Sequence, residues 1–190
     1  MPERLLVVSS NAGKVREIEA ILGEVVDQLD LDLPEIQTLD VAVVARQKAL
    51  AAFEQVGRPV VVEDTGLAID ALHGLPGALV RWFLATVGPA GICALIPSGA
   101  ARGATARTAV AFCDGETVEV FIGETRGRIV TTPAGTSGFG WDPIFQPEGA
   151  ARTFGEMDEA EKFAYSMRRR ALEQLCKRIG KASERGCGDP

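Results

Sequence analysis

The chain has 190 residues, 46% of them hydrophobic, which is enough for one substantial core but short for two independent domains. With 20 basic and 26 acidic side chains, its net charge of −6 disfavours general binding to a nucleic-acid backbone. It contains neither an apolar run of 18 residues nor a signal-peptide pattern. We therefore expect a cytoplasmic protein without a membrane span, with a single domain over residues 1–180 and a flexible Gly/Ser-rich tail over residues 181–190.

Several common catalytic chemistries lack the residues that they need. The four cysteines form no CxxC pair and a single histidine is available, so reduced, non-catalytic thiols are expected. That histidine, His73, lies in a Gly/Pro turn, so a catalytic triad would depend on one loop residue. Neither GxGxxG followed by a helix nor GxxxxGK[ST] occurs, which removes the main support for Rossmann and P-loop mechanisms.

The first half of the chain predicts alternating strands and helices. Residues 5–9 form a short apolar run, and apolar residues at helical spacing follow it, which indicates strand, loop and helix. Residues 25–33 alternate in hydrophobicity, and residues 40–56 have a long helical pattern. The β-branched run over residues 59–63 predicts a buried central strand that delivers Asp64 to its carboxyl end. Ligand clefts of α/β sheets open at such ends.

The second half predicts two covering helices and three further strands. Residues 80–84 and 90–96 are apolar-rich and favour helices. Residues 104–113, 117–124 and 127–130 predict strands, and the first gap between them has the Asp-Gly signature of a hairpin. Alternating strands and helices followed by a hairpin predict a mixed sheet.

Residues 9–14, Ser-Ser-Asn-Ala-Gly-Lys, lie between the first strand and the first helix. Their hydroxyls, amide and ammonium precede a helix N-terminus, where free N–H groups and the dipole favour an anion such as a triphosphate. Ser and Asn are equally typical of an ordinary helix N-cap. The sequence alone leaves both interpretations open.

Two carboxylates, Glu63 and Asp64, follow the predicted central strand and precede Thr65. One of them is suited to bind magnesium while the other activates water, and Glu35 offers a further hard oxygen ligand. The alternative is that Asp64 or Thr65 caps a helix while Glu63 stays exposed at the strand edge.

A long loop over residues 131–154 contains Phe139, Gly140, Trp141 and Asp142. The aromatic faces are suited to stack on a base and the carboxylate to accept from base N–H groups, although aromatics beneath a loop also fill cores.

A last helix is predicted over residues 159–178. Lys162 and Ser166 share one face, whereas Arg168 lies about 120° from Ser166 on an ideal helix. Local loop structure would have to intervene for all three to meet one ligand. The alternative is an ordinary solvated basic face.

Six segments, in order, resemble the inosine triphosphate pyrophosphatase family, also called HAM1-like. They are SSNAGKVREIE, DLPEIQ, RQKA, VVVEDTGLAIDAL-GLPG, SGFGWDPIF and AEKFAYSMRRRAL. This resemblance covers about residues 5–175. It implies an elongated α/β fold whose mixed β-sheet and flanking helices form two lobes around a central nucleotide-binding cleft. It further implies a homodimer that converts a non-canonical purine triphosphate, such as ITP, dITP or XTP, to the monophosphate and pyrophosphate with Mg2+.

The resemblance also implies a role for each matching position. Asp64 would act as general base and bind the metal with Glu35, and Glu63 would be its acidic helper. Residues implied to hold the phosphates are Ser9, Asn11, Lys14 and Lys48, with Glu17 supporting the loop. Lys14 is also implied to take part in catalysis, and Thr65 to bind substrate. Residues implied to hold the base or close on the substrate are Phe139, Gly140, Trp141, Asp142, Lys162, Ser166, Met167 and Arg168.

The chain departs from the family pattern at Met167, where Ser-His-Arg is expected. A thioether cannot donate the hydrogen bond that an imidazole offers to the purine 6-oxo group. We therefore expect cleavage to survive with altered base selectivity. The alternatives are a different triphosphate substrate in a specialised pathway, or a catalytically silent nucleotide-binding protein.

Overall fold

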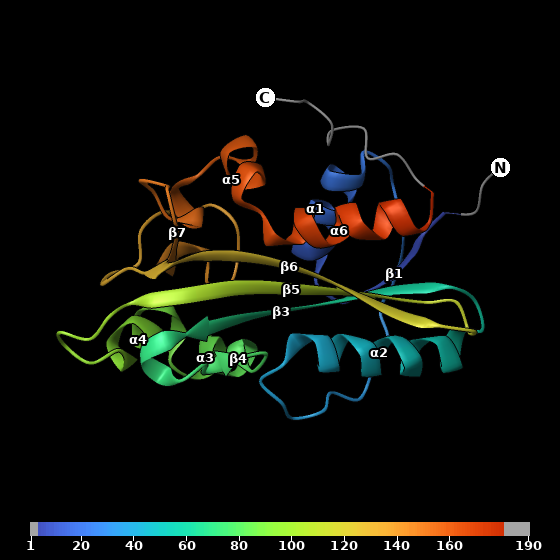
Figure 1. Ribbon diagram of the computed structural model, residues 1–190, viewed down its shortest axis with the longest axis horizontal. Helices are drawn as coiled ribbons and strands as arrows, with labels where there is room; N and C mark the ends of the chain where they lie inside the picture. Colours follow the sequence, from blue (N-terminus) through green and yellow to red (C-terminus); the bar gives the residue numbers. More distant parts are fainter. Residues whose placement is uncertain (1–3, 181–190) are drawn as a thin grey trace.

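The computed structural model describes residues 4–180, so the predicted tail over residues 181–190 lies outside the described residues. A mixed sheet of seven strands runs through the molecule in the order β2-β1-β3-β5-β6-β7, with β4 paired to β3 (Figure 1). The strands are β1 (Leu6–Val8), β2 (Asp27–Leu29), β3 (Val60–Ile69), β4 (Pro76–Gly77), β5 (Gly103–Cys113), β6 (Val118–Ile129) and β7 (Phe145–Pro147). This elongated α/β arrangement confirms the predicted fold class.

Helices cover both faces of the sheet, with α1, α5 and α6 on one and α2, α3 and α4 on the other (Figure 1). They are α1 (Ala12–Leu22), α2 (Val41–Val56), α3 (Val80–Thr86), α4 (Gly88–Leu95), α5 (Glu159–Tyr165) and α6 (Met167–Arg178). Short 3-10 turns are η1 (Asp70–Leu72), η2 (Asp142–Ile144) and η3 (Phe154–Glu156). Within residues 4–180, every helix falls short of the length and hydropathy that a membrane span requires.

Side-chain alternation along β3 separates the two faces at one end of the sheet. Val61 packs with α1 and α6, whereas Val60 and Val62 pack with α2. Because successive strand residues point to opposite faces, Glu63 continues the α1/α6 face and Asp64 continues the α2 face. A third core cluster, which includes residues of α3, α4, η2 and β7, fills the other end of the sheet and forms the second lobe.

The edge of β3 is open between the two lobes. On this edge β1 pairs with Val61 and Val62, and β4 pairs with Leu67 and Ala68. No strand of the described chain pairs with this edge over residues 63–66, although β5 pairs with the opposite edge throughout. The chain leaves β1 at this point to enter α1, which leaves space for a ligand beside the β3 edge.

The predicted strand over residues 59–63 was too short, since β3 runs to Ile69 and Asp64 lies inside it. The valine run marks only the part that pairs in parallel with β1, while antiparallel pairing to β5 carries β3 further. The division of 117–124 from 127–130 was also wrong. Both lie in the continuous β6, because Gly127 pairs in register with Ala104 and is no turn.

Three other predicted elements also differ from the structure. Of the alternating residues 25–33, only Asp27–Leu29 pair as a strand. The loop over 131–154 contains η2 and β7. The helix predicted over 159–178 is broken at Ser166, whose extended backbone ends α5 and whose hydroxyl caps α6 by accepting from Arg169 N–H at 3.2 Å.

The first turn of α6 approaches the sheet closely at Gly123 on β6. A Cβ atom at this position would lie 1.8 Å from the Met167 carbonyl oxygen. Glycine is therefore required for the backbone of α6 to approach the sheet at this depth. The close approach brings the next residue, Arg168, to the buried face of β3.

Candidate active site

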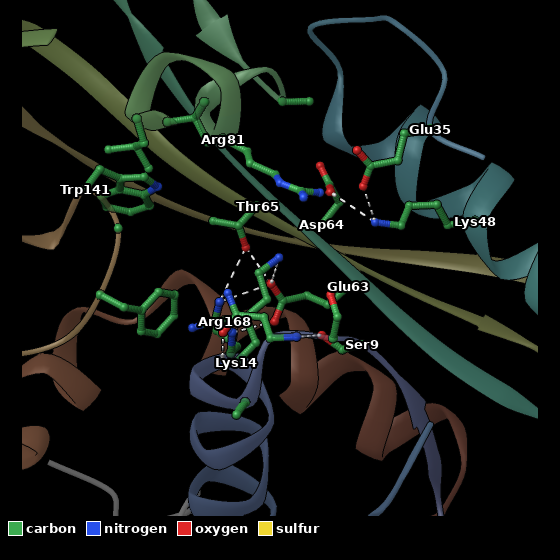
Figure 2. A pocket seen from close by; sticks show the side chains of 18 of the residues that line it. Ser9, Lys14, Glu35, Lys48, Glu63, Asp64, Thr65, Arg81, Trp141 and Arg168 are labelled. Carbon is green, nitrogen blue, oxygen red and sulfur yellow. Dashed lines mark hydrogen bonds and ion pairs between the residues drawn. The ribbon is translucent and has the colours of Figure 1, made fainter. Parts of the chain in front are cut away.

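A cleft of about 1350 Å³ opens along the free β3 edge and is lined from both lobes. Every site residue predicted from the sequence lines it except Ser166 and Glu17, the residue expected to support the loop. The lining predicted residues are Ser9, Asn11, Lys14, Glu35, Lys48, Glu63, Asp64, Thr65, Phe139, Gly140, Trp141, Asp142, Lys162, Met167 and Arg168. Residues from distant parts of the chain thus share one cavity, and Figure 2 shows many of their side chains pointing into it.

The loop after β1 is both a helix cap and part of the cleft wall. Asn11 Oδ1 accepts from the N–H groups of Gly13 at 2.9 Å and Lys14 at 3.1 Å, as an N-cap does. Ser9 Oγ accepts from Asn11 N–H at 3.2 Å. The backbone N–H groups of Gly13 and Lys14, which sequence analysis expected to be free for an anion, are therefore used by the cap. Anion binding here rests on the Ser hydroxyls, the Asn11 side-chain NH2 group and the Lys14 ammonium.

Glu63 lies at the centre of a buried charge cluster on the α1/α6 face. Arg168 donates to both of its carboxylate oxygens, with Nη2 3.0 Å from Oε1, and Lys14 Nζ lies 3.2 Å from Oε1. Arg168 also pairs with Glu17 of α1. Burial alone would raise the pKa of Glu63, but Arg168 and Lys14 outweigh it and hold this pKa well below its ordinary value. Glu63 therefore stays ionised.

These contacts replace the acidic-helper role that the sequence predicted for Glu63. Its side chain faces away from Asp64 across the sheet, and a carboxyl with so low a pKa exchanges no proton near neutral pH. We propose that Glu63 instead holds Lys14 and Arg168 in place. Burial by itself would lower the pKa of Arg168, yet Glu63 and Glu17 keep it above the ordinary value.

Lys162 of α5 links this cluster to the loop that carries Phe139 and Asp142. Its Nζ lies 2.7 Å from both Glu17 Oε1 and Asp142 Oδ2 and 5.1 Å from the centre of the Phe139 ring. Asp142 also accepts from Phe139 N–H at 2.8 Å. Burial raises the pKa of Asp142 despite the nearby Lys162. The Phe139 ring is thus held beside two cations, since Arg168 lies 5.8 Å from its centre.

The aromatic pair of the loop divides between the cleft and the core. Phe139 is half-buried and lines the cleft. Trp141 is buried and packs edge-on against Phe145 with ring centroids 5.5 Å apart, so it fills the core, and it also lines the cleft. Its other face borders the cleft beside Gly140.

A second charged group, built from Asp64, Glu35 and Lys48, faces α2 (Figure 2). Lys48 Nζ lies 2.8 Å from Glu35 Oε1 and 3.9 Å from Asp64 Oδ1. Burial raises the pKa of Asp64 to about 6, although Lys14 and Lys48 oppose the shift. The hydrogen bond from Lys48 lowers the pKa of Glu35 despite partial burial. A cation already bridges the two carboxylates.

The donor set at Asp64 fits a magnesium ion. Asp64 Oδ2 is buried and, within the described residues, has no hydrogen-bond partner. Buried carboxylate oxygens are normally paired, so a cation ligand is a natural use for this one. Among residues 4–180, no group of three or more Asp, Glu, His or Cys side chains converges. Two carboxylates completed by phosphate and water oxygens are the usual surroundings of Mg2+.

Sequence analysis missed Arg81, which extends from α3 in the second lobe toward Asp64 (Figure 2). It lines the main cleft and an adjoining pocket of about 130 Å³. Its charge contributes to the lowered pKa of Glu35 after the larger effects of Lys48. The available signal was a lone charge in the otherwise apolar stretch over residues 80–84.

Ser166, which the resemblance assigned to substrate binding, does not line the cleft. It is buried, and its hydroxyl caps α6. It nevertheless lies at the break between α5 and α6. Such a break was needed because Ser166 and Arg168 would point in different directions on one continuous helix. Met167, on the next position, is 3% exposed and places its thioether between the core and the cleft.

Fold and site together define an α/β protein whose cleft presents cations for a polyanion on one face of β3 and carboxylates for a metal ion on the other. The model of the Ham1 family matches residues 5–178, and the chain belongs to this family. It is 44% identical over 176 residues to "Inosine triphosphate pyrophosphatase 2" of Trypanosoma cruzi, covering 90% of each chain. It is 42% identical over 175 residues to "dITP/XTP pyrophosphatase" of Pyrobaculum aerophilum, covering 90% of this chain and 94% of that one.

Solved structures agree with this placement. The structure of a HAM1 protein from Coxiella burnetii superposes with a TM-score of 0.80 at 28% identity, covering 94% of this chain and all of that one. A nucleoside-triphosphatase, or dITP/XTP pyrophosphatase, from Mycobacterium abscessus superposes with a TM-score of 0.69 at 34% identity, covering 90% and 97%.

The raised pKa of Asp64 predicts a pH-dependent penalty on the metal-free fold. An unfolded Asp titrates near pH 3.9, whereas the folded carboxyl titrates at about 6. Stability is therefore lost as pH rises through this window, and the full penalty applies above it. With EDTA present, Asp64→Asn should stabilise the protein by about 1–3 kcal/mol at pH 8 and by little at pH 4. Urea unfolding at both pH values measures this, and equal effects at both would contradict it.

Proposed function

We propose that this chain hydrolyses non-canonical purine nucleoside triphosphates, of the ITP, dITP and XTP type, to the monophosphate and pyrophosphate. The observation that carries the proposal is the meeting of two charge groups at one open strand edge. Cations anchored by Glu63 face the cleft from one side of β3, and Asp64 with Glu35 face it from the other. Relatives that share more than 40% of this sequence are named for the same reaction.

The triphosphate binds in this proposal between the loop after β1 and the cations around it. Ser9 and Asn11 donate hydrogen bonds to phosphate oxygens, while Lys14 and Arg168 supply charge from below the β3 edge. Lys48 and Arg81 face the same space from α2 and α3. Because these cations are already oriented by carboxylates, little reorganisation is needed when the substrate arrives.

The metal would be held by Asp64 and Glu35, with the remaining positions filled by phosphate and water oxygens. When bound, magnesium neutralises phosphate charge and polarises the anhydride. We assign Mg2+ because both proposed ligands, Asp64 and Glu35, are hard oxygen donors, and the cleft lining within the described residues includes neither cysteine nor histidine.

Asp64 acts in this proposal as the general base. Its carboxylate accepts a proton from a water molecule while the water oxygen forms a bond to the α-phosphorus of the triphosphate. The bridging P–O bond breaks and its electron pair leaves with pyrophosphate. Before any metal binds, burial holds the pKa of Asp64 at about 6, so its carboxyl is ionised at neutral pH and available as a proton acceptor.

The base lies in this proposal against the loop that carries Phe139 and Asp142. The Phe139 ring offers a stacking face, and Lys162 fixes the Asp142 carboxylate that accepts from base N–H groups. Met167 lines the same region with a thioether.

A panel of triphosphates with product identification tests the function. The chain with Mg2+ should release pyrophosphate and a monophosphate from ITP, dITP and XTP faster than from ATP or GTP. Asp64→Asn should lower kcat by about 100-fold or more while still binding substrate, because the base is lost and the loop after β1 is retained. Release of orthophosphate and a diphosphate, or unchanged turnover in Asp64→Asn, would contradict the reaction class.

The Met167→His variant tests base selectivity. An imidazole can donate a hydrogen bond to a purine 6-oxo group, whereas the thioether can only pack against the base. We expect the kcat/KM ratio of ITP to ATP to rise about tenfold in this variant. Met167→Leu is the matched control, since it keeps an apolar side chain of similar volume and should leave the ratio unchanged. Equal ratios in all three proteins would refute a selectivity role for this position.

We further propose that the chain acts as a homodimer in the cytoplasm. Large apolar side chains are exposed along the α3/α4 region, with Trp82 61%, Val87 45% and Leu95 43% exposed. Such a patch is unfavourable in water and is typical of a protein interface. The buried thiols of Cys93 and Cys113 are reduced, which suits a reducing compartment, and cell fractionation tests the location.

The Leu95→Glu variant tests the dimer. A charge placed in the exposed apolar region should disfavour association, because an interface core rarely accepts an unpaired carboxylate. Sedimentation velocity at micromolar concentration should show a dimer for the parent chain and a monomer for the variant. Val25, which is 60% exposed in the connection between α1 and β2, provides the control substitution Val25→Glu, which should remain dimeric. A monomeric parent chain would refute the proposal.

A further inference from the structure

Thr108 is a fully buried hydroxyl residue in the middle of β5, outside the lining of the cleft. The sheet register places it opposite Thr65 of β3 on one side and Gly123 of β6 on the other. Directly opposed residues of neighbouring strands point to the same face. Thr108 therefore lies beneath the first turn of α6, which packs directly on Gly123.

The hydrogen-bond directions around Thr108 follow from the number of available protons. Lys14 Nζ and Arg168 Nη2, which can only donate, lie 3.2 Å and 3.0 Å from Glu63 Oε1. This oxygen therefore acts as an acceptor, and Thr65 Oγ1 donates its single proton to it at 2.5 Å. Thr65 Oγ1 also lies 3.1 Å from Thr108 Oγ1. Since the proton of Thr65 is already used, Thr108 must be the donor in this second contact. The three residues form a directed chain from Thr108 through Thr65 to Glu63.

This series of hydrogen bonds ends at the Glu63 carboxylate, which holds two cations of the cleft. Glu63 Oε1 receives Lys14, Arg168 and Thr65 together. We propose that Thr108 is a positioning residue for phosphate binding, which fixes the Thr65 hydroxyl and through it the orientation of Glu63, Lys14 and Arg168. The inference rests on the proposed function only in taking these cations to meet phosphate.

The same series of hydrogen bonds also limits the contacts that the Thr65 hydroxyl can make with a substrate. Its only proton points to Glu63, so Thr65 borders the cleft without a free hydroxyl donor for substrate. Without the proton from Thr108, the Thr65 oxygen would accept more strongly from Arg168 Nη2, which already lies 3.5 Å away. That change would draw the guanidinium from the geometry in which it donates to both oxygens of Glu63.

Binding of inorganic tripolyphosphate with magnesium chloride, measured by titration calorimetry, tests the proposal without turnover. Valine matches threonine in shape but has no hydroxyl, so Thr108→Val should weaken binding and lower kcat/KM by about tenfold each. Thr108→Ser should recover most of both losses. Thr105→Val is the matched control on the same strand, because Thr105 bonds Arg126 outside this network, and both values should stay at the parent level.

A double-mutant cycle with Thr65→Val separates positioning from a general effect on the fold. Thr108 reaches Glu63 only through the Thr65 hydroxyl, so Thr108→Val should cause no further loss of affinity in the Thr65→Val background. Additive losses, or parent-like affinity of Thr108→Val alone, would overturn the proposal. Thr108→Ala gives a second hydroxyl-free variant if valine prevents folding. If the parent chain cleaves no triphosphate, the proposed function fails, yet the tripolyphosphate cycle still decides the role of Thr108.

Discussion

The ion pair between Glu63 and Arg168 is the contact on which the architecture of the cleft depends. Both side chains are almost completely buried, and burying either charge alone would be strongly unfavourable. Removing one partner would leave an uncompensated charge beneath the sheet. The pair therefore fixes where α6 must lie, and it requires both the break at Ser166 and the absence of a side chain at Gly123. Secondary structure here is arranged around one buried guanidinium.

Strand alternation then divides the remaining chemistry. Adjacent residues Glu63 and Asp64 point to opposite faces of β3, which separates a carboxylate with a lowered pKa from one with a raised pKa. Glu63 has two close cations and a hydroxyl donor, whereas Asp64 lies deep beside Lys48 with one oxygen unpartnered. Identical functional groups one residue apart thus acquire different tasks. Both carboxylates border the cleft because β1 ends at Val8 and leaves this edge of β3 free.

Local signals in the sequence predicted the elements that local interactions determine. The cap at Asn11 and the apolar spacing after it define α1, and the long helix beginning after Asp40 was predicted almost to the residue. Elements set by distant partners were missed. The extension of β3 depends on pairing with β5, and the approach of Arg81 to Asp64 depends on how the second lobe packs. Most residues predicted for the site nevertheless line one cleft, because the family resemblance supplied long-range information that periodicity lacks.

The charge balance of the cleft explains why a metal ion suits the proposed reaction. Its lining carries five cationic side chains, Lys14, Lys48, Arg81, Lys162 and Arg168, and six carboxylates, Asp30, Asp32, Glu35, Glu63, Asp64 and Asp142. A free triphosphate would therefore meet no net positive charge, although single contacts favour it. The carboxylates cannot be removed without loss, since they orient the cations and keep them ionised in a partly dehydrated site. In the proposed reaction, a divalent cation accompanying the triphosphate would offset this charge at the end where Asp64 and Glu35 lie. Oriented cations and a metal-bound substrate are thus two parts of the same electrostatic arrangement.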